Sequence, residues 1–390
     1  MIAQRLRQLR LARGLSLEGL AAATGGIVTK QAISKYENGK AQPTPVVLNR
    51  MAAALGAKAA HLCSEPSVRI EFIAYRKGSG LLKREQESVE SLVRQCLEER
   101  IRLQELIGQD YRTDLPVKSQ DVVSVEDAER AAENLRKKWN LGLDPISSVI
   151  GVLEDRLIHV LEIDAGDRFD GISAVARDDH RIAAAAVVSR RGIAGGRQRL
   201  NLAHELGHLV LKVPEGVDEE ASAFRFGAAF LAPAETVRRE IGERRTFIRS
   251  DELLLMKRKF GMSAQAVLYR LRNLAIIGES YYRQWCIHIN KLGWRRKEPA
   301  EMPPEKPSWL HQSVLRALGE ELISRETAES IIGSSFEDGE PLSLVERRAF
   351  MKLPLEERRR IMAKQAERMA SHYEDDREWR QFQGGDFIAR

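Results

Sequence analysis

The sequence predicts a mainly α-helical protein with a small antiparallel sheet, in the α+β class. Apolar residues at helical spacing dominate the first 60 residues, the region after residue 124 and the last 80 residues. Strand-like runs lie in the middle of the chain, over residues 159–163, 171–176 and 182–188, with a polar turn at 178–180 before the last run. A length of 390 residues with 43% hydrophobic residues predicts two to three domains.

The composition predicts a cytoplasmic chain with no membrane partner. No stretch approaches the roughly 18 uninterrupted apolar residues that a membrane-spanning helix needs. Residues 1–13 contain four arginines and lack the apolar core of a secretory signal. Cys63, Cys96 and Cys286 are far apart and form no Cys-x-x-Cys motif, which argues against a disulfide framework and a thiolate metal site.

Basic charge is concentrated at the N-terminus. Residues 1–64 contain nine lysines and arginines against two glutamates, whereas the net charge of the whole chain is only +6. The rest of the chain is therefore close to neutral. A basic module joined to a near-neutral body is typical of a domain that binds a polyanion, and a solvated basic face is the alternative.

The first 60 residues predict four or five short helices, two of them arranged as a helix-turn-helix. Ser16 caps one helix, Gly25 and Gly26 end it, and Thr29 caps the next helix over residues 30–37. In this geometry the second helix enters the DNA major groove. The candidate contacts to bases and phosphates are Thr29, Lys30, Gln31 and Ser34, with Lys35 and Asn38 near the DNA backbone.

The same segment resembles a known family. RLRQLRLARGLSLEGLAAATG, followed by VTKQAISKYENGKAQPTPVVLNRMAAALG, is similar to the Xre/Cro repressor domains, most closely at residues 33–39. The resemblance implies a DNA-binding domain over residues 1–66 and a double-stranded DNA operator as its partner. Leu17 departs from the family, which usually has a DNA-facing glutamine there, and the Gly25-Gly26 turn is extended. A helical module that does not bind DNA is the alternative.

Residues 67–118 predict a linker followed by a helical connector. Residues 74–88 are charged and marked by glycine and serine, which favours a linker. A seam at steps of three and four follows, interrupted by Arg100 and otherwise formed by Val89, Val93, Cys96, Leu103 and Ile107. Such a seam either pairs two chains into a homodimer that suits a palindromic DNA site, or packs on its own domain.

The most informative motif is His204-Glu205-x-x-His208 in a strongly helical segment. A spacing of four residues places both imidazoles on one helix face, one turn apart, where two nitrogens can bind one divalent ion. Glu205 lies beside such an ion and can take a proton from water. Two histidines with a purely structural role are the alternative.

A catalytic zinc site needs a third protein ligand and one open position. Asp218, Glu219 and Glu220 begin a second helix after a loop, so a carboxylate there can complete a site of two histidines and one glutamate.

RLNLAHELGHLVL, followed by EASAFRFGAAFLAP, resembles the ImmA/IrrE metallopeptidase family. The resemblance implies a zincin-like domain over residues 119–296 with Glu220 as the third ligand, Glu219 being the alternative. Phe224 stands at a position that is usually small and polar. The implied cofactor is Zn²⁺, with Mn²⁺ as the alternative.

Residues 297–390 predict a proline-rich connector and a helical C-terminal region. The connector covers residues 298–309, a helix begins near Leu353, and a tail follows from Trp379 to Asp386.

The two resemblances together imply a DNA-binding transcription regulator with a zinc-dependent, gluzincin-like endopeptidase that cleaves a repressor-type protein or itself. The alternatives are a DNA-binding sensor that uses the metal fold only to bind a ligand or partner, and a toxin–antitoxin component whose C-terminal helices bind a partner.

Overall fold

The fold is taken from a computed structural model of the chain. It describes residues 2–64, 68–74, 82–108, 115–166, 169, 171–178, 181–336 and 350–375. The chain divides into two compact units, Met1–Ala317 and Leu318–Arg390. The expected domain boundary at residues 66 and 67, the turn residues 179 and 180, and the tail from Trp379 to Asp386 lie outside the described residues.

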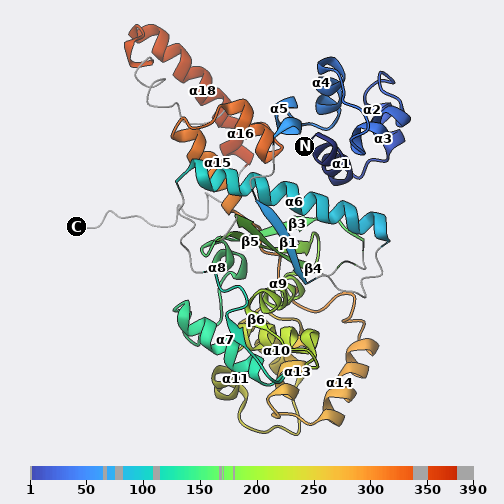
Figure 1. The fold of residues 1–390 in the computed structure, drawn as a ribbon. Coiled ribbons are helices and arrows are strands. Elements are labelled where there is room, and N and C mark those ends of the chain that lie inside the picture. Colours follow the sequence, from blue (N-terminus) through green and yellow to red (C-terminus); the bar gives the residue numbers. More distant parts are fainter. Residues whose placement is uncertain are drawn as a thin grey trace, which may run out of the picture. The chain divides into compact units, whose positions relative to one another are not determined.

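Five short helices form the N-terminal head (Figure 1): α1 (Ile2–Ala12), α2 (Leu17–Ala23), α3 (Lys30–Glu37), α4 (Pro45–Ala54) and α5 (Ala59–Cys63). As predicted, Ser16 and Thr29 cap α2 and α3, because their side chains accept hydrogen bonds from the backbone N–H groups of Gly19 and Ala32. The apolar core of the head includes Leu6, Leu9, Leu20, Ile33, Met51 and Leu55.

The central sheet is mixed, with the strand order β1-β4-β5-β3. Its strands are β1 (Arg69–Ala74), β3 (Ile158–Ile163), β4 (Gly171–Asp178) and β5 (Arg181–Arg190). The α+β class is confirmed, but the expectation of a purely antiparallel sheet is wrong for β3, which pairs parallel with β5. The reason is that β5 lies between β3 and β4, so β3 and β4, which follow one another in sequence, are not neighbours in the sheet. β1 was not predicted and pairs antiparallel with β4.

One long helix, α6 (Lys83–Leu106), covers one face of the sheet, and α9 (Gly195–Val210) covers the other (Figure 1). Residues 83–88 are helical, which corrects the expected linker at that point; residues 75–81 are not described. Val89 and Val93 from the predicted seam are buried against the protein's own sheet. This seam is therefore not available for the homodimer that was one of its two interpretations.

The remaining elements of the first unit lie mainly around α9. They are β2 (Gln120–Asp121), α7 (Asp127–Lys138), α8 (Val149–Glu154), β6 (Leu211–Lys212), α10 (Glu219–Leu231), α11 (Ala234–Ile241), α12 (Ser250–Phe260), α13 (Ala264–Asn273) and α14 (Glu279–Lys291). A further helix, α15 (Trp309–Gly319), crosses the boundary between the two units and is not part of this group. The largest apolar cluster joins these helices to one face of the sheet. It holds α9 and α10 in a rigid setting.

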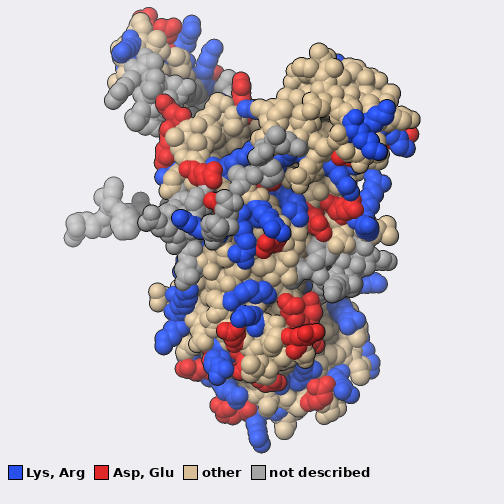
Figure 2. Space-filling model, viewed as in Figure 1, with Lys and Arg blue, Asp and Glu red and all other residues tan. Residues whose placement is uncertain are grey.

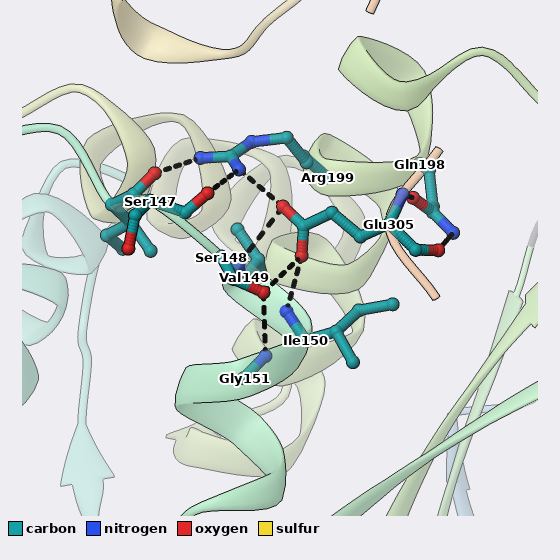
Figure 3. A network of polar contacts seen from close by, with 9 residues as sticks. Ser147, Ser148, Val149, Ile150, Gly151, Gln198, Arg199 and Glu305 are labelled. Carbon is teal, nitrogen blue, oxygen red and sulfur yellow. Dashed lines mark hydrogen bonds and ion pairs between the residues drawn. The ribbon is translucent and has the colours of Figure 1, made fainter. Parts of the chain in front are cut away.

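The proline-rich residues 298–309, which we call the strap, contain no helix or strand before Trp309, and they do not form a free connector. Glu305 is bound on the domain surface: it pairs with Arg199 of α9 and accepts hydrogen bonds from the backbone N–H groups of Val149 and Ile150 at 3.1 and 2.8 Å (Figure 3). Trp309, at the end of the strap, packs edge-on against the buried ring of His159, with 4.4 Å between ring centroids.

The second unit contains α16 (Arg325–Ile332) and α18 (Leu355–Asp375), which agrees with the helix expected near Leu353. None of the helices in the described ranges is long and apolar enough to cross a membrane.

Candidate metal centre and DNA-binding surface

Two glycines allow α9 and α10 to pack closely. A Cβ atom on Gly227 of α10 would lie 2.9 Å from the backbone nitrogen of His204, and one on Gly207 of α9 would lie 3.1 Å from Cα of Ala223. Any larger residue would push the helices apart. This packing places the first turn of α10 over the middle of α9.

The structure brings His204, His208 and Glu220 together at one point. The Nε2 atoms of the two histidines lie 3.1 Å apart. Glu220 Oε2 is 3.4 Å from His204 Nε2, and Glu220 Oε1 is 3.6 Å from His208 Nε2. One ligand atom from each of the three residues lies within 4.8 Å of the others. The histidines are buried, whereas Glu220 is partly open to solvent.

Glu219, the alternative ligand, lies at the other side of the His208 ring. Its Oε1 atom is 3.5 Å from His208 Nδ1 and not beside the Nε2 atom that faces Glu220. Lys118 contacts both residues, because its Nζ atom donates to the His208 carbonyl at 3.0 Å and lies 3.8 Å from Glu219. Glu219 is therefore placed to orient His208, a common role of carboxylates around metal-binding histidines.

Glu205 is buried and is held by the sheet. Ser173 of β4 donates a hydrogen bond of 2.6 Å to Glu205 Oε2. Gly171, at the start of the same strand, leaves room for the carboxylate, because a Cβ atom there would lie 2.5 Å from Glu205 Oε1. Sequence reasoning missed Ser173, since nothing in a strand of small residues marks one serine as a partner of a distant glutamate.

Phe224 forms one wall of the cluster. Its ring lies 4.1 Å from the His204 ring, centroid to centroid. This contact explains how an aromatic residue fits where a small polar one was expected: it packs on the imidazole and restricts the orientation of His204.

The electrostatics of the cluster favour a positive charge at its centre. Hydrogen bonds from His204 and then from His208 hold the pKa of Glu220 far below its usual range. Burial lowers the pKa of His208, but the hydrogen bond to Glu220 and the charges of Glu205, Glu220 and Glu219 outweigh burial and raise it. The carboxylates thus create a site that suits a cation.

On the head, α3 presents the predicted polar residues to solvent. Thr29, Lys30, Gln31, Lys35 and Asn38 are exposed and Ser34 is partly exposed. Asn38 Nδ2 donates to the Ser34 carbonyl at 2.7 Å, and Lys30 lies 3.8 Å from Glu18. Figure 2 shows Lys and Arg side chains gathered over the α2–α3 region of the head.

Two family models match the chain. Residues 6–62 match the family described as Helix-turn-helix, and residues 187–272 match the family described as IrrE N-terminal-like domain. The chain is an Xre-type helix-turn-helix domain fused to an ImmA/IrrE-type domain. The comparison with curated proteins found no match.

Both resemblances seen in the sequence are thus confirmed. The Xre-type head supports a DNA-binding regulator, and residues 187–272 form a domain of the metallopeptidase-like ImmA/IrrE type. The match to the ImmA/IrrE-type domain covers the end of β5, the helices from α9 to α12 and most of α13, and so includes every residue of the metal cluster.

Proposed function

We propose that the protein is a cytoplasmic transcription regulator whose ImmA/IrrE-type domain is a zinc-dependent endopeptidase. Its substrate is a repressor-type protein or the chain itself. The observation that carries the proposal is the convergence of His204, His208 and Glu220 beside the buried Glu205, in a chain whose head presents a recognition helix for DNA.

The residues fit a zinc ion. Two histidine nitrogens and one carboxylate are a common ligand set of catalytic zinc, and this set leaves one coordination position open. Nitrogens bound to one tetrahedral zinc at about 2.0–2.1 Å lie roughly 3.3–3.4 Å apart. The separation of 3.1 Å between the Nε2 atoms of His204 and His208 is close to that value. Mn²⁺ is the alternative ion.

When bound, the ion would polarise the scissile carbonyl and lower the pKa of water. Glu205 then has the role of general base: its carboxylate accepts the proton of the attacking water and later delivers it to the leaving amine. The hydrogen bond from Ser173 to Oε2 fixes this carboxylate in position for the transfer. Glu219 and Lys118 hold His208 in place.

In the head, we assign Thr29, Lys30, Gln31 and Ser34 to base and phosphate contacts, and Lys35 and Asn38 to the DNA backbone. Thr29 caps the start of α3, Asn38 caps its end, and the other four lie on the helix. A DNA partner also supports the cytoplasm as the place of action.

The Glu205→Gln variant tests the proposal, because glutamine keeps the shape of the side chain and removes the base. We expect it to keep zinc and operator binding and to lose both substrate cleavage and gene regulation in cells. The His204→Ala/His208→Ala double variant should lose zinc in metal analysis. Unchanged regulation by Glu205→Gln with zinc still bound would favour the sensor alternative and contradict the peptidase.

A further inference from the structure

A cleft of about 790 Å³ opens beside the N-terminal half of α9, which precedes the histidines of the metal cluster. Its volume lies in the range of ligand sites in proteins. We call it the arginine cleft, after the arginines in its wall: Arg190, Arg197, Arg295 and Arg296. Tyr269 and Trp294 also line it, and strap residues Glu298, Glu301 and Met302 form part of its wall.

The arginine cleft leads to the candidate metal centre along one face of α9. Arg197, Asn201, His204 and His208 are spaced by four, three and four residues, so they form one stripe on the helix. The first two line the cleft and the last two belong to the metal cluster. Phe224 connects the two sites, because it lines the cleft and packs on His204.

The charge of the cleft is positive. Of its acidic lining residues, Glu298 is neutralised by the buried Lys257 at 2.8 Å, which leaves Glu301. Arg295 and Arg296 are exposed and form no ion pair with any residue that the structure describes. Side chains with a free positive charge on the rim of a concave site favour an anionic ligand.

The wall formed by the strap is fixed before any ligand binds. Figure 3 shows the carboxylate of Glu305 between Arg199 and the N-terminus of α8. Gln198 adds two hydrogen bonds to the backbone of Glu305, and Gly195 donates to the Met302 carbonyl at 3.0 Å. A preformed wall reduces the entropy cost of binding.

We propose that the arginine cleft binds an acidic stretch of a protein substrate. On α9, Arg197 lies about 10 Å from His204 along the helix axis. An extended peptide covers this distance in about three residues. An Asp or Glu about three positions from the cleaved bond is therefore the specificity determinant. The position of that bond rests on the proposed function, whereas binding to the cleft does not.

The test uses the full-length protein and a short fluorescein-labelled peptide with glutamates at alternate positions between leucines and alanines. A second peptide has glutamine in place of each glutamate. Fluorescence anisotropy measures binding to wild type and to Arg295→Gln/Arg296→Gln. The matched control Arg258→Gln/Lys291→Gln removes two exposed charges that do not line the cleft.

We expect the acidic peptide to bind in a salt-dependent manner, and the glutamine peptide and the Arg295→Gln/Arg296→Gln variant each to show binding weakened about tenfold. The control variant should bind like wild type. Wild-type affinity of Arg295→Gln/Arg296→Gln would overturn the proposal. So would a loss of binding in Lys30→Gln/Lys35→Gln, which would place the peptide on the head.

The outcome is separable from the proposed function. If the zinc-loaded protein binds the acidic peptide through the cleft and cleaves no peptide or protein, the peptidase proposal fails and the cleft assignment stands.

Discussion

The hydroxyl of Ser173 on β4 lies 2.6 Å from Oε2 of Glu205 on α9. The sheet thus sets the position of the carboxylate that we propose as the base. We expect Ser173→Ala to lower the cleavage rate by about 10- to 100-fold, because the carboxylate loses its fixed orientation. Zinc content should stay unchanged. Ser189→Ala, which removes another buried serine of the same sheet, is the control, and an equal loss there would attribute the effect to sheet packing.

Glu220 and Glu219 should differ in their effects on metal affinity. Glu220 faces the Nε2 atoms of both histidines, and Glu219 faces Nδ1 of His208. We expect Glu219→Ala to weaken zinc binding by about 10-fold and Glu220→Ala by well over 100-fold. Competition with a zinc-sensitive dye measures both affinities. A stronger loss in Glu219→Ala would reverse the ligand assignment.

Gly227→Ala should disturb the metal cluster without replacing any of its ligand residues. The added methyl group would meet the backbone of His204, which cannot move aside as a flexible side chain does. We expect a loss of about 1–3 kcal/mol in the free energy of unfolding and weaker zinc binding. Gly278→Ala is the control, because a Cβ atom there has open space. Denaturant unfolding of the apo protein checks the first part, and equal stabilities of the two variants would contradict it.

Glu129 should make the free energy of unfolding decrease at acidic pH. It accepts hydrogen bonds from Arg270 at 2.7 Å and from Arg225 at 2.8 Å. Burial raises the pKa of Glu129, but these two arginines outweigh burial, and the pKa lies below its ordinary value of 4.5. A lowered pKa means that the stabilisation is fully present above pH 4.5 and is lost as the pH falls through the folded-state pKa.

Glu129→Gln should therefore lower the free energy of unfolding by about 3–5 kcal/mol at neutral pH, because Arg270 remains buried without its carboxylate partner. The difference from wild type should shrink in acid. Thermal unfolding of both proteins across pH 3–7 measures this difference in stability. A difference that grows in acid would contradict a lowered pKa for Glu129.

Lys30 and Lys35 should contribute to the salt dependence of operator binding. Each phosphate contact that is lost lowers the slope of log affinity against log salt by about one. We expect Lys30→Gln/Lys35→Gln to weaken DNA binding and lower this slope by about two. Lys58→Gln, an exposed lysine at the start of α5, should leave both unchanged. Titration of DNA fragments at several salt concentrations tests this, and an unaltered slope would place α3 away from the phosphates.

Local features of the fold could be read from the sequence. The caps Ser16 and Thr29, the break at Gly25 and Gly26, and the bounds of α3 depend on neighbouring residues, so sequence spacing was enough to predict them. Strand neighbours depend on distant residues. The parallel pairing of β3 with β5 and the pairing of β1 with β4 follow from the order of strands across the sheet, which no single strand encodes.

At the candidate site, too, features set by neighbouring residues could be predicted and features set by distant residues could not. The spacing of His204 and His208 predicted a shared helix face, and the resemblance pointed to Glu220, which the structure places beside both rings. The support from Ser173 comes from another element and has no motif of its own. The strap was expected to be a connector because its prolines suggest stiffness. Its attachment depends on a partly buried carboxylate, Glu305, that local sequence does not mark.

The long helix α6 has one more consequence. The head packs on α6 through the buried ion pair of Arg5 and Glu98. The apolar side chains of α6, such as Val93, pack against the sheet. Two copies bound side by side on a two-fold symmetric operator would therefore have to meet through another surface. In each copy, α6 would link the recognition helix to the ImmA/IrrE-type domain as one rigid element.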